Sequence, residues 1–407
     1  MTPHGSIRPA RAVSGSAFLL LILVTLPGCF TGITFTVNAL QDAVDAAPGD
    51  GVCATAAKVC SLRAAIQEAN KLPGSDIILV PAGTYQLSLA EPSDGGITGG
   101  DLDVTDTLWI RGLGVQPSVV DAGGLYRVFD LYGGFVRLDD IEIRDGDADE
   151  GGGIRVDAAA LVWGFGLDIR ANLALTNGAG IMNRGRLVLF DSQIRDNHVA
   201  ARGGGIETTT LAITTLWNST VSGNSANHGG GMHTTGLTYL FNSTVSGDSA
   251  SASSGGIFNS GVITIANSTI AFNKAVGKGA EDAGGVRNYE KGVVIVRNSI
   301  IARNINPNLN ATDCAGTLDS QGYNLVEDIT SCTLAGTTTG NIIGQNPLLD
   351  PLAVYSFGTP THRLQARSPA IDAGHPNTPG TGPPACWAED QRGVVRQKCD
   401  IGAYERN

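Results

Sequence analysis

The sequence predicts an all-β protein folded as a single-stranded parallel β-helix, and three observations lead to this prediction. A glycine-rich signature recurs with its last glycine at positions 153, 180, 205, 231, 256 and 285. A second signature recurs at the same spacing, for example as Asn218-Ser219-Thr220-Val221 and Asn242-Ser243-Thr244-Val245. Between the two, apolar and polar residues alternate, as in Val262-Ile263-Thr264-Ile265, which is the period of a strand. Two signatures locked to one period indicate a structural unit stacked on copies of itself.

Aligning the copies puts apolar residues in three columns, one for each strand of a coil. The columns are Ile181, Ile206, Met232, Ile257, Val286; Leu189, Leu216, Leu240, Ile265, Val296; and Ile194, Val221, Val245, Ile270, Ile301. We expect each column to stack along the helix axis at about 4.8 Å per coil, over residues 76–304. A leucine-rich or hexapeptide solenoid is excluded because the chain shows neither repeat.

A polar column accompanies the apolar ones. Its members are Asn172, Asn197, Asn224, Asn273 and Asn304. A buried asparagine is costly alone, but stacked amides hydrogen-bond to one another, so we expect an asparagine ladder along the axis.

The first 28 residues are predicted to be a signal peptide. Arg8 and Arg11 precede the apolar run from Ala17 to Leu26, which is too short to span a bilayer as a helix. Leu26-Pro27-Gly28-Cys29 resembles a bacterial lipobox, which implies lipidation of Cys29. An ordinary secretory signal is the alternative. Phe30 follows the cysteine, which by resemblance to the bacterial sorting rule favours the outer membrane. Residues 29–49 are interpreted as a linker.

The remaining cysteines predict disulfides. Six cysteines follow Cys29, all outside the repeat, and an even number in an exported chain favours disulfides over free thiols. We expect the pairs Cys53–Cys60, Cys314–Cys332 and Cys386–Cys399.

The formal net charge of −11 argues against a nucleic-acid partner, because an acidic surface repels phosphates.

Residues 50–75 are predicted to cap the N-terminal end of the solenoid with a helix. Ser61 is a suitable N-cap, and an apolar stripe follows at Leu62, Ala65, Ile66 and Ala69. Such a helix would cover the exposed strand edges of the first coil. The run from Cys60 through Asn70 closely resembles the CSLREA-type domain of bacterial exported β-helix proteins, with Ala64 in place of the usual glutamate.

Residues 305–407 lose the period and are rich in proline. Ser368-Pro369-Ala370-Ile371-Asp372-Ala373-Gly374 and the run from Cys399 to Glu405 resemble the choice-of-anchor Q domain. The resemblance implies an irregular, disulfide-bonded C-terminal cap. Together the two resemblances imply a right-handed, pectin-lyase-like β-helix, but they bring no catalytic assignment.

Candidate catalytic residues therefore come from position alone. The outward position after the glycine signature carries Arg155, Glu207, His233 and Arg287 on one side of nearby coils. A lyase needs a basic residue among acids, and a hydrolase needs paired carboxylates. Outward charges on a solenoid are more commonly just solvated, so these four are candidates only.

An acidic segment offers a candidate calcium site. Asp145, Asp147 and Asp149 alternate like the start of a calcium-binding loop, but Glu150 stands where such a loop has glycine. A solvated acidic loop is the alternative, and no other cofactor is expected.

These features together predict a cell-envelope lipoprotein. The β-helix would serve structural, adhesive or glycan-binding contacts, with the membrane as a partner through the N-terminal lipid and a polysaccharide or envelope protein as a further partner. The alternative function is a polysaccharide lyase or glycoside hydrolase acting on acidic polysaccharide. The expected location is the bacterial outer membrane or cell surface, with secretion as the alternative.

Overall fold

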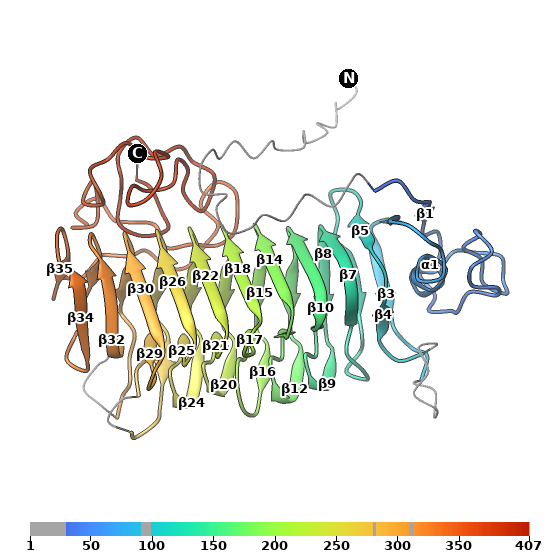
Figure 1. Cartoon of the computed structure of the whole chain (residues 1–407), viewed down its shortest axis with the longest axis horizontal. Coiled ribbons are helices and arrows are strands. Elements are labelled where there is room, and N and C mark those ends of the chain that lie inside the picture. Colours follow the sequence, from blue (N-terminus) through green and yellow to red (C-terminus); the bar gives the residue numbers. More distant parts are fainter. Residues whose placement is uncertain (1–29, 91–98, 280–281, 309–312, 407) are drawn as a thin grey trace.

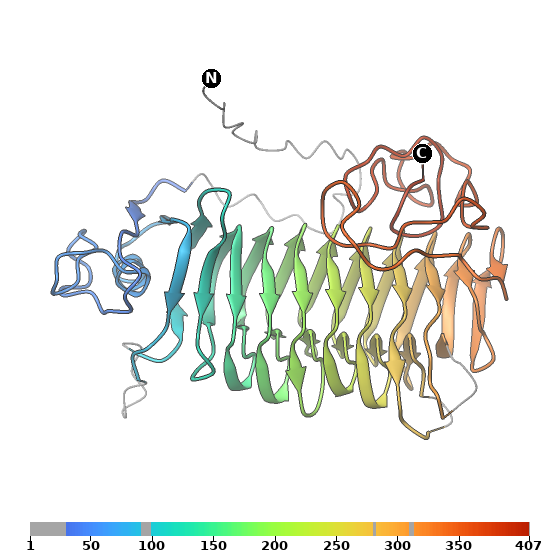
Figure 2. The same ribbon diagram turned by 180° about the vertical axis from the view of Figure 1, so that it is seen from behind.

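The chain winds as a parallel β-helix, as the sequence predicts (Figures 1 and 2). The computed structural model describes residues 30–90, 99–279, 282–308 and 313–406. Strands of successive coils pair in parallel and form three sheets that run along the axis, which we name A, B and C.

Sheet A consists of β1 (Thr34–Thr36), β2 (Asp76–Val80), β4 (Leu102–Val104), β5 (Leu108–Gly112), β7 (Phe129–Asp139), β10 (Ile154–Phe165), β13 (Ile181–Asn183), β14 (Arg186–Phe190), β17 (Ile206–Thr208), β18 (Ile213–Trp217), β21 (Met232–Thr234), β22 (Leu237–Phe241), β25 (Ile257–Asn259), β26 (Val262–Ala266), β29 (Val286–Asn288), β30 (Val293–Arg297), β32 (Cys314–Gln321) and β34 (Cys332–Thr337). Sheet B consists of β3 (Gly83–Gln86), β6 (Ser118–Asp121), β8 (Ile141–Arg144), β11 (Asp168–Arg170), β15 (Gln193–Arg195), β19 (Thr220–Ser222), β23 (Thr244–Ser246), β27 (Thr269–Ala271), β31 (Ile300–Ala302), β33 (Leu325–Val326) and β35 (Ile342–Ile343). Sheet C consists of β9 (Asp147–Glu150), β12 (Leu173–Asn177), β16 (His198–Val199), β20 (Ser225–His228), β24 (Ser249–Ser253) and β28 (Lys274–Ala275).

The three predicted apolar columns are confirmed as stacks of register partners. Ile206 lies between Ile181 and Met232, Leu216 between Leu189 and Leu240. Val221 lies between Ile194 and Val245 in the same way. The members of all three columns are buried and belong to one core that fills the inside of the helix. Short strands on three sides of each coil account for the repeat length.

The predicted asparagine ladder also forms. Asn172 Nδ2 donates to Asn197 Oδ1, and Asn197 Nδ2 donates to Asn224 Oδ1, each over 2.9 Å. Two acids continue the ladder, which the sequence reading missed: Asn224 Nδ2 donates to Asp248 Oδ1, and Asn304 Nδ2 to Asp313 Oδ1, again over 2.9 Å.

The repeated glycines meet two different steric demands. Gly203 opens its signature with φ +65°, a left-handed conformation that glycine adopts without strain. Gly205 closes it, and a Cβ atom there would lie 2.6 Å from the carbonyl oxygen of Gly231 on the next coil. The close approach of neighbouring coils therefore requires glycine.

The N-terminal cap contains the expected helix, α1 (Leu62–Ala69) (Figure 1). Ser61 Oγ accepts a hydrogen bond from the Ala64 amide, as an N-cap does. All eight helical residues are buried. Residues 29–49 were expected to be a linker. This segment instead includes β1, which pairs with β2 before the chain turns into the cap.

The C-terminal region differs from a simple end cap. Its first part extends the solenoid through β32 to β35, past residue 304. The remainder, residues 346–406, which we call the tail, lies along the side of the coils near the C-terminal end (Figures 1 and 2). Leu364, Ala370 and Ile401 of the tail pack on Ile300 and Leu325 of sheet B. Side chains also form hydrogen bonds across this contact. Ser246 Oγ, for example, is hydrogen-bonded to His362 Nε2 over 2.8 Å.

The three predicted disulfides, Cys53–Cys60, Cys314–Cys332 and Cys386–Cys399, are present. Disulfides persist in oxidising compartments, so they agree with an extracellular protein. No helix within the described part of the chain is long and apolar enough to cross a membrane.

Candidate functional site

One row of sheet A brings the sequence-predicted charged residues together. Across adjacent coils, Arg155 pairs in register with Met182, Met182 with Glu207, and Glu207 with His233. The row continues through Phe258 to Arg287. It also begins two coils earlier than the sequence indicated, with Asp103 and Asp130. We call this line of residues the charged row.

The charged row is not the solvated surface expected from its outward position. Glu207 and His233 are only 5% and 4% exposed, and the Arg155 side chain is 23% exposed. Burial of this kind requires internal pairing of the charges.

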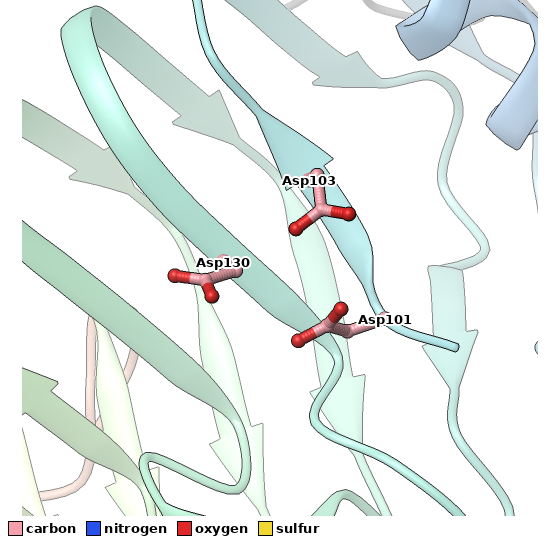
Figure 3. Close-up of side chains that lie close together, drawn as sticks. All are labelled: Asp101, Asp103 and Asp130. Carbon is pink, nitrogen blue, oxygen red and sulfur yellow. The ribbon is translucent and has the colours of Figure 1, made fainter. Parts of the chain in front are cut away.

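Three aspartates meet at the start of the charged row (Figure 3). Asp101 immediately precedes β4, Asp103 lies on β4 and Asp130 on β7. One carboxylate oxygen from each residue lies within 4.8 Å of those of the other two. All three residues are buried. We call this group the acid cluster.

Arginines neutralise two of the three aspartates. Arg127 Nη1 lies 2.7 Å from Asp101 Oδ2 and 3.0 Å from Asp130 Oδ2. Arg155 Nε donates to Asp130 Oδ1 over 2.9 Å. In contrast, Asp103 Oδ1 is buried and accepts no hydrogen bond from any described residue. Burial, followed by the charges of Asp101 and Asp130, raises the pKa of Asp103 to about 7. The cluster thus holds one carboxyl in excess of its arginines, which a proton or a cation can neutralise.

This arrangement permits two kinds of chemistry. Clustered carboxylates are the ligands that Ca²⁺ prefers, although Arg127 and Arg155 already occupy several of the oxygens. A neutral carboxylic acid close to an ionised carboxylate is also the arrangement that glycoside hydrolases use. The side chains of Asp101 and Asp130 are 11% and 1% exposed, so a substrate would have little access to them.

The middle of the charged row forms a buried pair. His233 Nδ1 lies 3.0 Å from Glu207 Oε1, and its ring stacks on Phe258 with centroids 4.9 Å apart. Burial raises the pKa of Glu207. Arg287, the last of the predicted residues, lies 2.7 Å from Asp282 Oδ1. Phe258 separates Arg287 from the pair in register, so the four predicted residues do not converge on one point.

The acidic segment expected as a loop is instead a strand. Asp147 and Asp149 lie on β9 with exposed positions, and Asp145 adopts a left-handed conformation before it, with φ +53°. Among the described residues, the acids that could share one ion are those of the acid cluster. A calcium ion at Asp145, Asp147 and Asp149 stays a prediction.

The outer face of the longer strands of sheet A carries a second feature that the sequence reading missed. Half-buried aromatic side chains follow one another at equivalent positions: Phe165 pairs in register with Phe190, Phe190 with Trp217, and Trp217 with Phe241. The Phe165 and Phe190 rings stack with centroids 4.7 Å apart. Each aromatic residue directly precedes a turn signature, as in Phe190-Asp191 and Trp217-Asn218, and that recurrence was a usable signal.

Tryptophans and an arginine widen this surface. Trp109, Arg137 and Trp163 form the neighbouring register column. The Arg137 guanidinium lies 4.6 Å from the Trp109 ring centroid and 4.5 Å from that of Phe165. We call the surface formed by Trp109, Arg137, Trp163, Phe165, Phe190, Trp217 and Phe241 the aromatic face. A row of rings beside cationic groups is suited to stacking with flat, partly apolar ligands.

The tail contacts one end of the aromatic face, and the N-terminal segment contacts the other. Trp387 of the tail packs on both Trp217 and Phe241, with ring centroids 4.8 Å and 5.6 Å apart. The ring centroid of Phe30 lies 5.6 Å from that of Trp109. Cys29, the predicted lipidation site, lies outside the described residues.

No protein-family model and no curated protein matches the chain. The CSLREA and choice-of-anchor Q resemblances therefore stay resemblances. A search of solved structures finds the crystal structure of pectate lyase Pel9A, with a TM-score of 0.52 and 14% sequence identity, covering 93% of this chain and 97% of that one. At this identity the likeness shows the fold alone. The chain is a parallel β-helix of the architecture seen in that lyase.

Proposed function

We propose that this protein is an exported β-helix that binds polysaccharide along its aromatic face without cleaving it. The observation that carries the proposal is the succession of half-buried rings on neighbouring coils, from Phe165 through Phe190 and Trp217 to Phe241. The charged row does not suit this role, because Glu207 and His233 at its middle are buried and paired with each other.

The geometry of the face matches the chemistry of a glycan chain. A sugar ring presents an apolar C–H face that packs against aromatic side chains, and its hydroxyls accept hydrogen bonds from arginine. Successive coils are about 4.8 Å apart, which is close to the length of one pyranose unit in a linear chain. A rigid row of rings at this spacing could therefore meet several sugars in succession.

Affinity electrophoresis tests the proposal. The protein is run through gels containing polygalacturonate, alginate, xylan or hydroxyethyl cellulose, and retardation by at least one is expected. Trp163→Ala and Phe190→Ala should weaken the retardation roughly tenfold each, the range of an aromatic stacking contact plus its burial. Leu211→Ala is the control, because Leu211 is 94% exposed on a turn outside the aromatic face. Unretarded wild-type protein in every gel would refute the proposal.

The acid cluster supports a second candidate, cleavage of an acidic polysaccharide. Asp103, with its pKa raised to about 7, could act as the acid, and Asp101 or Asp130 as the ionised partner. An assay of reducing ends and of unsaturated uronate absorbance on the same polysaccharides tests it. Turnover that is lost in Asp103→Asn would favour this candidate over simple binding.

Anchoring by a lipid on Cys29 is part of the proposal. Phe30 packs against Trp109 and Phe135, so the mature N-terminus would leave the molecule beside the aromatic face. Mass spectrometry of the membrane-extracted protein should find a diacylglyceryl group on Cys29. A mature N-terminus at any other residue, without lipid, would indicate secretion instead.

A further inference from the structure

A pocket opens where the tail meets the last coils of sheet A. Its volume is about 520 Å³, a size that accommodates one or two sugar rings. One side is formed by Arg297 of β30, Gln321 of β32 and Thr337 of β34, and the other by His375 and Pro384 of the tail. Arg297 continues the register column that carries Phe190, Trp217 and Phe241, with Ala266 between, and Gln321 directly follows Ser320, the register partner of Val296. The pocket is therefore in line with the aromatic face.

Arg297 is the charged group of this pocket. Its side chain is half-buried, and its Nε donates to no hydrogen-bond acceptor among the described residues. No acid within the described part of the chain forms an ion pair with it. Three other arginines on the strands of sheet A differ, since Arg137, Arg155 and Arg287 are each paired with an aspartate. Arg111 and Arg186 of sheet A also lack an ion pair in the described structure, but both are exposed, whereas Arg297 is half-buried.

The remaining wall suits the ring of a sugar. Tyr323 and His375 form an edge-to-face pair with centroids 4.7 Å apart, and the backbone N–H of His375 donates to Asn298 Oδ1 over 2.9 Å. That hydrogen bond attaches the tail to the coil and fixes His375 at the pocket. The exposed hydroxyl of Thr337 and the amide of Gln321 provide polar contacts.

We propose that this pocket binds an acidic sugar, with the sugar carboxylate paired to Arg297 and its ring against Tyr323 and His375. The proposal deepens the proposed function and rests on it, because it names an acidic residue of the bound polysaccharide as the group recognised. A guanidinium pairs with a carboxylate through two parallel hydrogen bonds, and a partly dehydrated pocket strengthens such a pair.

Titration of the full-length protein with sodium glucuronate or glucose, followed by ligand-detected NMR, tests the proposal. Sodium sulfate is added as a competitor, and its binding is measured by the displacement of glucuronate. Glucuronate should bind, and glucose should bind roughly tenfold more weakly because it lacks the charge. Arg297→Gln should weaken glucuronate binding by a similar factor. Arg186→Gln is the matched control, an exposed arginine on β14 away from the pocket, and should leave binding unchanged. Thr337→Trp should block the pocket without removing a buried group.

Two results would overturn the proposal. Glucuronate bound no better than glucose, or equally well by Arg297→Gln and Thr337→Trp, would remove the pocket as the site. Sulfate that binds as tightly as glucuronate would reduce the pocket to a general anion site. The proposed function fails separately: polysaccharide that does not bind wild-type protein, while glucuronate still depends on Arg297, would refute the aromatic face but leave the pocket.

Discussion

Replacing Asp248 with asparagine should stabilise this protein at neutral pH. Asp248 stands in the asparagine ladder, where its Oδ1 accepts from the backbone N–H and the Nδ2 of Asn224. Its Oδ2 has no hydrogen-bond partner in the described structure. At the equivalent rungs Asn224 Nδ2 donates to Ile194 O, and Asn273 Nδ2 donates to Val245 O. Asparagine at 248 would supply the missing donor toward the carbonyl of Val221, the register partner of those two residues.

The magnitude follows from the proton that Asp248 takes up on folding. Complete burial raises the pKa of Asp248 well above its usual value, so the fold favours the neutral carboxyl. A group with a raised folded pKa contributes its full stability below its unfolded pKa and loses it as the pH rises. At pH 7.5, protonating a carboxyl of ordinary pKa costs about 5 kcal/mol, and at pH 4.5 under about 1 kcal/mol. Relaxation of the neighbouring coils reduces the gain, so we expect Asp248→Asn to stabilise by about 2–4 kcal/mol at pH 7.5.

Thermal unfolding followed by circular dichroism at pH 7.5 and pH 4.5 measures the effect. Asp248→Asn should raise the Tm by roughly 5 °C at pH 7.5, given the size of the chain, and by little at pH 4.5. Asn224→Asp is the matched control on the adjacent rung, because it removes the Nδ2 donor to Asp248 and adds a buried carboxyl. That variant should lower the Tm at pH 7.5 more than at pH 4.5.

Two outcomes would refute the reasoning about Asp248. Asp248→Asn could leave the Tm at pH 7.5 unchanged, which would mean that the carboxyl is ionised in the fold or satisfied in another way. Alternatively, the variant could shift the Tm equally at both pH values, which would tie the effect to packing and not to the proton.

Three further predictions test other parts of the structure. The pKa of Asp103 is raised to about 7, so its contribution to stability is lost as the pH rises from about 4 to 7. Asp103→Asn should therefore stabilise the protein by about 2 kcal/mol at pH 8 but not at pH 4. Equal Tm shifts at both pH values would contradict this. Gly205→Ala should destabilise by about 1–3 kcal/mol in denaturant unfolding because the added Cβ would lie 2.6 Å from Gly231 O, whereas Gly133→Ala, with 3.9 Å to its nearest neighbour, should change little. Replacing Cys314 and Cys332 by serine should cost about 3 kcal/mol, since the disulfide closes a loop of 18 residues; an unchanged Tm under non-reducing conditions would contradict that estimate.

The repeat made most of the fold predictable from the sequence. Positions such as Ile206 and Leu216 recur at one period, and only a stack of coils brings residues of the same column together. The cap helix and the cysteine pairs were predictable because each is local, as with Ser61 and Ala64. The position of the tail was not, because it depends on contacts such as Ser246 to His362, which are far apart in the chain and follow no period.

The site was predictable only in part, for the same reason. Arg155, Glu207 and His233 share the position after the glycine signature, so their common row could be predicted. Asp103 and Asp130 occupy that row where the coils have not yet adopted the regular signature, and their encounter is visible only in the register of β4 and β7. The burial of the row could not be predicted, because alternation along a strand tells inside from outside but not what covers the outside.

Hydroxyl-radical footprinting with and without polygalacturonate, alginate, xylan and hydroxyethyl cellulose tests most directly whether the aromatic face binds glycan. At least one of these polysaccharides should protect the peptides that contain Trp163, Phe165 and Phe190 from oxidation, while Leu211 on its exposed turn stays equally reactive. Protection confined to any other surface, or protection by none of the four, would contradict the proposal.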